Sequence, residues 1–238
     1  MISYAAISRP GGREVNEDSL DFYERQGTYF FALADGLGGH GQGEVASKIV
    51  VTEAIAAFKT GGGDLARCFT YAQERLLAEQ ARQNVRDELK STLVCLKIVN
   101  DKAVWGHVGD SRLYCFAKNG LAARSLDHSV PQMLVASGEI REKDIRGHED
   151  RNRLLRVMGM EWNSPKYEIG KERALGKRDA FLLCSDGFWE WITEKDMIRH
   201  LRGAAAPAAW LAAMEADILA NAKGHNMDNY SAIAVFVS

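Results

Sequence analysis

The order of short apolar runs and helical blocks constrains the fold of this chain more than any other feature. Runs of apolar or alternating residues, which are typical of strands, recur along its length. These runs are Ile2–Ser8, Leu20–Glu24, Tyr29–Ala34, Thr92–Val99, Ala103–Val108, Arg112–Ala117, a short run near Leu121, Tyr167–Ile169, Ala180–Cys184 and Ser231–Val237. The four runs in the middle of the chain are separated by short polar turns and predict a hairpin meander.

Four segments have the spacing of helices instead. Glu44–Phe58 is followed by a second helix that extends to about Asn84 and for which Asp64 is a suitable N-cap. Glu194–Leu201 and Pro207–Ala222 follow near the end of the chain. Strands that succeed one another with short turns, interrupted by paired helices, favour antiparallel sheets covered by helices over an alternating parallel fold. We therefore predict a layered α+β sandwich.

The composition suits one globular domain. The 238 residues are 46% hydrophobic and 26% charged, and no repeat or low-complexity linker divides them. We expect a single domain over residues 1–238. It includes a polar, charge-dense segment at about 138–165.

Charge and cysteine spacing exclude several classes of function. The formal net charge of -2 supplies no basic field for nucleic acid or an anionic membrane, so a phosphorylated partner must be recognised by a local site. The cysteines lie far apart, which favours reduced core thiols over a disulfide framework or a zinc site. The start of the chain has no signal-like segment, and the Ala-rich stretch Ala204–Ala222 is broken by proline and acidic residues. We expect a cytoplasmic protein that does not enter a membrane.

Carboxylates stand next to apolar strands at four places. Asp35 and Asp186 each follow an apolar run and precede a glycine, Asp228 leads into the last run, and Glu17 and Asp18 precede the second. An Asp-Gly pair is also ordinary turn chemistry, so each pair alone can be a turn. Gathered in one place, these side chains would repel one another at neutral pH, and divalent cations are the simplest remedy. Ligation by oxygen alone favours Mg²⁺ or Mn²⁺ over zinc.

Five short motifs occur in an order that is similar to that of one protein family. They are Arg13-x-x-Asn16-Glu17-Asp18, Ala34-Asp35-Gly36-Leu37-Gly38-Gly39-His40, Val108-Gly109-Asp110-Ser111-Arg112, Ser185-Asp186-Gly187 and Asp228-Asn229. Over essentially its whole length the chain resembles the metal-dependent protein phosphatases of the protein phosphatase 2C type, in their compact bacterial form. The five motifs together are far more specific than any one of them. The resemblance implies a four-layer α/β/β/α sandwich with two central antiparallel sheets flanked by helix pairs.

The same resemblance implies a set of metal ligands. Asp35 would bridge two core cations, Mn²⁺ or Mg²⁺, and the carbonyl oxygen of Gly36 would bind one of them. Asp186 and Asp228 would complete the direct protein ligands.

Further residues take roles by the same resemblance. Glu17 and Asp18 would act through metal-bound waters, with a capping or solvated acidic turn as the alternative. Arg13 would bind the substrate phosphate, because a planar guanidinium can donate two parallel hydrogen bonds to phosphate oxygens. Asp110 would bind a third, weaker cation or would be a hairpin-turn residue. For Asp127-His128-Ser129 we expect a structural role at a strand end and helix cap.

The chain departs from the family pattern at two places. Leu37 replaces a histidine that is a proposed general acid in eukaryotic relatives, so the acid is unassigned. His40 is an alternative candidate, and it can equally be a surface or helix-entry residue. The second departure is Lys90-Ser91-Thr92, where relatives often have Gly-Thr-Thr; only Thr92 matches, and we expect the effect to be confined to packing.

The resemblance implies hydrolysis of phosphoserine and phosphothreonine by a metal-bridging water or hydroxide, without a phosphoenzyme. The partners would be phosphorylated proteins, among them a Ser/Thr kinase and its substrates, and the protein would act as a monomer. Two other classes stay open. One is a binding module that keeps the fold without turnover, against which the intact set of Asp35, Asp186 and Asp228 argues. The other is a hydrolase of small phosphoesters or nucleotides.

Overall fold

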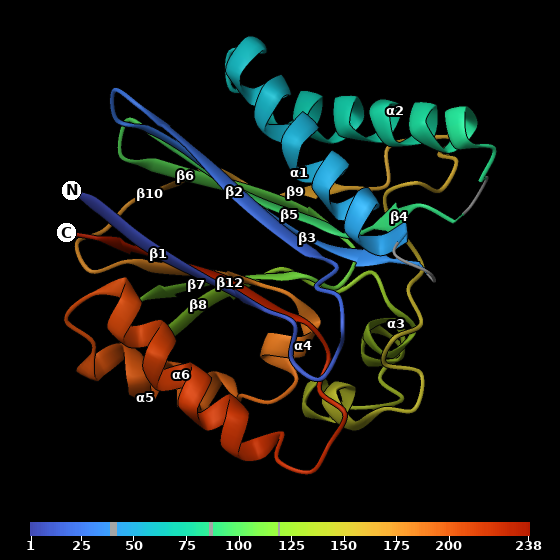
Figure 1. The fold of residues 1–238 in the computed structure, drawn as a ribbon. Coiled ribbons are helices and arrows are strands. Elements are labelled where there is room, and N and C mark those ends of the chain that lie inside the picture. The colour runs from blue at the N-terminus through green and yellow to red at the C-terminus, as the bar shows by residue number, and fades with distance from the viewer. Residues whose placement is uncertain (39–41, 86–87, 119) are drawn as a thin grey trace.

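Two antiparallel sheets packed face to face, with helices on both outer faces, form the protein (Figure 1). The computed structural model describes residues 1–38, 42–85, 88–118 and 120–238. The arrangement confirms the predicted α+β class and the four-layer α/β/β/α sandwich. None of the helices in these ranges combines the length and the apolar composition that are needed to cross a bilayer.

One sheet joins the two ends of the chain to its middle. Its strands are, in spatial order, β1 (Ile2–Arg9), β12 (Tyr230–Val237), β11 (Ala180–Cys184), β7 (Arg112–Ala117) and β8 (Gly120–Arg124). Strands β1 and β12 pair from Ile2 opposite Val237 to Arg9 opposite Tyr230. The first and last strands therefore lie side by side (Figure 1).

The other sheet carries two of the acidic motifs on neighbouring strands. Its strands are, in spatial order, β10 (Arg173–Ala174), β6 (Lys102–Val108), β5 (Leu93–Val99), β3 (Thr28–Leu37) and β2 (Asp18–Arg25), and β4 (Lys90–Ser91) and β9 (Glu168–Ile169) pair with β3 and β6. Asp18 in β2 lies opposite Asp35 in β3. The register therefore brings acidic residues of two separate motifs together at one end of this sheet.

Helices cover the outer face of each sheet. The first sheet is covered by α4 (Asp186–Trp189), α5 (Glu194–Gly203) and α6 (Pro207–Asn221), and the second by α1 (Gln42–Thr60) and α2 (Leu65–Gln83). The short α3 (Val130–Ala136) and the 3-10 helix η1 (Glu142–Gly147) lie between β8 and β9 in the chain. The Asp64 side chain accepts the Ala66 N–H at 3.0 Å, which confirms Asp64 as the N-cap of α2. Asn84 ends the helix in the left-handed conformation, with φ 55°.

The predicted meander is interrupted, because the chain changes sheets between β6 and β7. The hairpins β5–β6 and β7–β8 form as expected, but they belong to different sheets. The crossing occurs at Gly109, whose φ of +98° is a conformation that L side chains rarely adopt. Apolar alternation predicts each strand but does not distinguish a turn within a sheet from a step to the facing sheet. The crossing carries Asp110 to the end of the sandwich.

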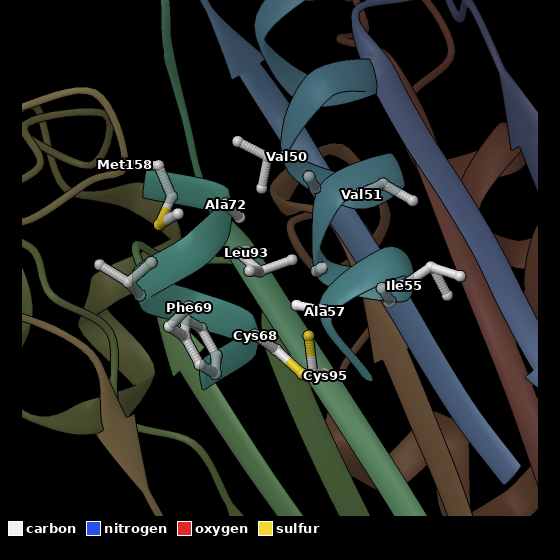
Figure 2. Close-up of a cluster of buried hydrophobic side chains, with 14 of the residues drawn as sticks. Val50, Val51, Ile55, Ala57, Cys68, Phe69, Ala72, Leu93, Cys95 and Met158 are labelled. Carbon is white, nitrogen blue, oxygen red and sulfur yellow. The ribbon is translucent and has the colours of Figure 1, made fainter. Parts of the chain in front are cut away.

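Three apolar layers hold the sandwich together. The central layer, between the two sheets, contains Phe31, Val94 and Leu183 among its fully buried members. The layer under α1 and α2 includes Phe69, and Figure 2 shows side chains from both helices pointing towards β5. The four cysteines are buried free thiols, which agrees with their prediction as core residues.

The central layer gives a direct test of the fold. Phe31 in β3 is fully buried between the sheets, while its cross-strand partner Phe22 in β2 is 41% exposed. Phe31→Ala should lower the free energy of unfolding by about 3–5 kcal/mol, since a large cavity is left in a packed layer. The matched change Phe22→Ala should cost clearly less in the same urea titration. Equal losses would contradict the buried position of Phe31.

Candidate metal centre

The five motifs meet at one end of the sandwich, in a pocket of about 420 Å³. Acidic side chains from both sheets line it together with an arginine. Its lining residues are Arg13, Val15, Glu17, Asp35, Gly36, Leu37, Gly38, Asp110, Asn152, Leu154, Asp186, Asp228 and Asn229. The structure therefore brings together all the site residues proposed from the sequence except Asp18, which lies just below the pocket.

Hydroxyl groups of the neighbouring strand fix the backbone at Asp35. Ser91 Oγ donates to the Asp35 carbonyl oxygen at 2.8 Å, and Thr92 Oγ1 accepts the Asp35 N–H at 2.9 Å. The next residue must be glycine, because a Cβ on Gly36 would lie 2.0 Å from the carbonyl oxygen of Gly43. Ser91 stands where relatives often have threonine and retains a hydroxyl for its bond to Asp35, while Thr92 is the residue that matches the family pattern.

Asp186 begins the short helix α4, directly after β11. The preceding residue, Ser185, donates its Oγ–H to Asp18 Oδ2 at 2.7 Å and accepts the Ser231 N–H at 2.9 Å. This serine joins β2 of one sheet to β11 and β12 of the other. Asp18 is thereby held in a buried position, where the Asp186 charge acts on it.

Asp228 and Arg13 form an ion pair at the rim of the pocket. Arg13 Nη2 donates to Asp228 Oδ2 at 3.0 Å, and the Arg13 side chain is 48% exposed. Asn229 holds the loop of Arg13 in place, because its Nδ2 donates to the carbonyl oxygens of Pro10 and Val15, both at 2.9 Å. The phosphate-binding candidate is thus tied to the start of β12.

A buried network of side chains supports Asp110. Trp189 Nε1 donates to the Asp110 carbonyl oxygen at 3.0 Å, and the Arg112 guanidinium lies over the Trp189 ring at 3.5 Å from its centroid. Arg112 in turn donates to both carboxylate oxygens of Asp127, at 2.8 and 2.6 Å. Because Trp189 belongs to α4, this network links Asp110 to the helix that Asp186 begins.

The carboxylates at the pocket have few cationic partners. Burial raises the pKa of Asp35 and of Asp110 well above the usual range, and repulsion from Asp186 adds to both effects. Burial also raises the pKa of Asp18 to about 7, against partial relief from the Ser185 hydroxyl. Asp18 Oδ1 has no hydrogen-bond partner in the described part of the chain.

Cationic side chains compensate this cluster only in part, and the buried Arg112 acts on Asp110 alone of the proposed ligands. Among the described residues, Arg13 pairs with Asp228, and Arg151 Nη2 lies 3.9 Å from Asp186 Oδ2. The remaining candidate metal-ligand atoms are carboxylate and carbonyl oxygens. These are the ligands that hard divalent cations such as Mg²⁺ and Mn²⁺ prefer, so the residues present fit such ions.

Some features of the centre were not predicted, and one prediction cannot be examined. Leu37 lines the pocket, while His40 lies outside the described residues. The supporting roles of Trp189, Arg151 and Asn229 were missed. Only Asn229 carried a signal, because it belongs to a matched motif; the other two reach the site through tertiary packing.

Comparison with known proteins agrees with this geometry. The family model for protein phosphatase 2C matches residues 10–226. Serine/threonine protein phosphatase PstP of Mycobacterium tuberculosis is 30% identical over 209 residues, which are 85% of this chain and 39% of that protein. Serine/threonine phosphatase stp of Listeria monocytogenes is 30% identical over 205 residues, covering 80% of this chain and 79% of the relative.

A solved structure shares the fold and contains the metal. The catalytic domain of PstP in complex with two manganese ions superposes with a TM-score of 0.82 at 26% identity, covering 100% of this chain and 99% of that chain. The chain spans about two fifths of the full mycobacterial protein and nearly all of this catalytic domain. The chain therefore belongs to the protein phosphatase 2C family, a family of metal-dependent serine/threonine phosphatases.

Proposed function

We propose that this protein hydrolyses phosphoserine and phosphothreonine on other proteins, using two divalent cations held at the pocket. The observation that carries the proposal is the convergence of Asp35, Asp186 and Asp228 from both sheets beside Arg13. A pocket built only to bind a phosphoprotein would need positive charge and not a cluster of carboxylates. The acidic cluster therefore favours a catalytic centre over a binding module.

The proposed ligands are those that the family resemblance implies, and all of them line the pocket. Asp35 would bridge the two cations, with the Gly36 carbonyl oxygen, Asp186 and Asp228 as the other direct ligands. Manganese is the ion in the related catalytic domain, and magnesium has the same preference for oxygen.

The remaining acidic residues would act at the edge of this set. Glu17 at the rim and Asp18 beneath the pocket would hold waters in place. Asp110 would contribute to a third, weaker site.

Bound divalent cations would lower the pKa of water and offset the charge of the phosphate. Arg13 would orient the substrate phosphate. The Arg13 side chain is half exposed and donates to Asp228. Its guanidinium is therefore accessible to an entering phosphate and can donate hydrogen bonds to two of the phosphate oxygens. Leu37 and Leu154 contribute apolar surface to the pocket and reduce the access of bulk water beside that phosphate.

The leaving serine or threonine oxygen needs a proton. No histidine occurs among the described residues that line the pocket. Water at the centre or an unassigned side chain would supply this proton.

The setting of the reaction is also part of the proposal. We take residues 1–238 as one catalytic domain, with segment 138–165 as a flap beside the pocket, because Asn152 and Leu154 of that segment line it. The substrates would be phosphorylated proteins in the cytoplasm, among them a Ser/Thr kinase and its targets, and the protein would act as a monomer.

A phosphopeptide panel with nucleotide controls tests the reaction class. Phosphate release from phosphoserine and phosphothreonine peptides should require added Mn²⁺ or Mg²⁺ and should stop with EDTA, since the carboxylates supply no nucleophile of their own. ATP and nucleoside monophosphates should be turned over far more slowly. A preference for nucleotides would instead support a small-phosphoester hydrolase, and full activity in EDTA would exclude the metal mechanism.

Asp186→Asn tests the proposed ligand set. The variant should fold but should lower kcat by at least about a hundredfold, because the charge that holds the cation is lost. Asp101→Asn, an identical change at an exposed turn, is the matched control and should behave as wild type. Wild-type turnover by a folded Asp186→Asn protein would remove Asp186 from the centre.

Arg13→Ala tests the phosphate clamp. Because a clamp acts on the phosphate in both the ground and the transition state, KM for phosphopeptides should rise and kcat should fall. Calorimetric Mn²⁺ binding should be retained. Arg25→Ala, at an exposed position at the far end of β2, serves as control. Loss of Mn²⁺ with unchanged substrate kinetics would identify Arg13 as a structural partner of Asp228.

A further inference from the structure

Two histidines are stacked behind the crossing that carries Asp110. His107 at the end of β6 and His128 before α3 have ring centroids 4.6 Å apart and an interplanar angle of 15°. Both are nearly fully buried. His107 Nε2 hydrogen-bonds to the Leu126 carbonyl oxygen at 2.7 Å, which joins β6 to the segment that contains His128.

His128 binds both polar backbone groups of Gly109. The Gly109 N–H donates to His128 Nδ1 at 3.2 Å, and the His128 backbone N–H donates to the Gly109 carbonyl oxygen at 2.9 Å. An Nδ1 that accepts a hydrogen bond carries no proton, so the neutral ring carries its proton on Nε2. That atom lies 3.2 Å from Glu168 Oε1, in β9. Burial and the neighbouring His107 lower the pKa of His128 to about 4, so the ring is neutral at pH 7.

Gly109 itself has little freedom to move. A Cβ at this position would lie 2.6 Å from Thr92 Cγ2, so the glycine backbone is in close contact with Thr92. The Thr92 hydroxyl also hydrogen-bonds to Ser111 Oγ at 2.7 Å and accepts the Asp35 N–H. The two residues on either side of Asp110 are therefore fixed, Gly109 by His128 and Ser111 by Thr92.

We propose that His128 is a positioning residue for the metal centre, which through its hydrogen bond with Gly109 fixes the direction in which Asp110 enters the pocket. This role rests on the proposed function of Asp110 at a weaker cation site. His128 lies outside the pocket lining. Glu168 follows the segment 138–165 and also pairs with Arg156 of that segment at 3.3 Å. His128 is therefore the contact through which the flap region reaches the backbone next to Asp110.

The cluster of His107, His128 and Glu168 is not arranged as a separate metal site. Ligand atoms of His107, His128 and Glu168 lie within 4.8 Å of one another. With His128 Nδ1 engaged by Gly109, however, Nε2 carries a proton and offers no lone pair to a cation. Stacked rings also direct their in-plane lone pairs side by side and not towards one point. Hydrogen bonding explains this cluster better than metal binding.

Two substitutions separate the hydrogen bond from the bulk of the ring. His128→Phe keeps an aromatic ring on His107 but has no acceptor for Gly109. His128→Asn has an amide oxygen at the position of Nδ1 and can accept the Gly109 N–H. His107→Phe is the matched control, because it removes a buried imidazole from the same stack without touching Gly109.

Mn²⁺ calorimetry on the EDTA-treated protein is the first readout. Asp110→Ala defines which binding phase depends on Asp110. His128→Phe should weaken that phase by about 10–100-fold, as loss of an outer partner of a metal ligand does, and should leave the tighter core phase intact. His128→Asn and His107→Phe should resemble wild type. If His128→Phe binds like wild type while Asp110→Ala loses its phase, the positioning role is wrong and the role of Asp110 stands.

The second readout needs no metal. In ¹⁵N NMR spectra of the metal-free protein, His128 Nδ1 should have the shift of an unprotonated nitrogen, and the Gly109 amide should be protected from hydrogen exchange. His128→Phe should abolish that protection, and His128→Asn should restore it. A protonated Nδ1, or a protected Gly109 amide in His128→Phe, would overturn the proposal. Should Asp110→Ala leave Mn²⁺ binding unchanged, the third-site role fails, and with it the effect of His128 on metal.

A Zn²⁺ titration tests the competing explanation, that His107, His128 and Glu168 form a metal site. Binding of one Zn²⁺ that persists in Asp110→Ala and disappears in both His107→Phe and Glu168→Gln would identify the histidine cluster as a metal site, and would overturn the hydrogen-bonding role. No such binding is expected.

Discussion

Repulsion among buried carboxylates is the constraint on which the rest of the structure depends. At one end of the sandwich Asp18, Asp110 and Asp186 are buried and Asp35 is half-buried, and desolvation together with like charge raises the pKa of each. Such a group is costly unless cations share its charge. The fold must therefore hold these side chains at fixed positions against their own repulsion, and Asp18, Asp35 and Asp110 each have a separate support.

Those supports are mostly short hydroxyl side chains that bond to backbone or to a carboxylate. Ser91 and Thr92 hold Asp35, and Ser185 holds Asp18 while it accepts a backbone N–H from β12. A hydroxyl suits this role because it both donates and accepts, and it adds no charge to a site that already carries too much of one sign. Trp189 supports Asp110 without charge in the same way.

Much of the fold and the acidic set could be predicted from the sequence, but the supports could not. Asp35 and Asp186 were recognisable because both carboxylates follow apolar runs and belong to motifs that match one family together. The sandwich followed from the strand and helix order. The crossing at Gly109 was missed, since alternation within β6 and β7 is the same whichever sheet each strand joins. Trp189 was missed because its contacts depend on that crossing.

The division of the ligands between the sheets explains why the core must be rigid. Asp35 belongs to one sheet, and Asp186 and Asp228 belong to the ends of strands in the other. A sliding of one sheet over the other would change the separation of these carboxylates directly. The fully buried side chains between the sheets, such as Phe31 and Leu183, resist such sliding because close-packed interiors deform little. Cations bound at the centre would join the two sheets at the same place where the bond from Ser185 to Asp18 already does. With cations held by the proposed ligands, metal affinity and sheet packing would be linked, and a substitution in the central layer would reach the site without touching a ligand.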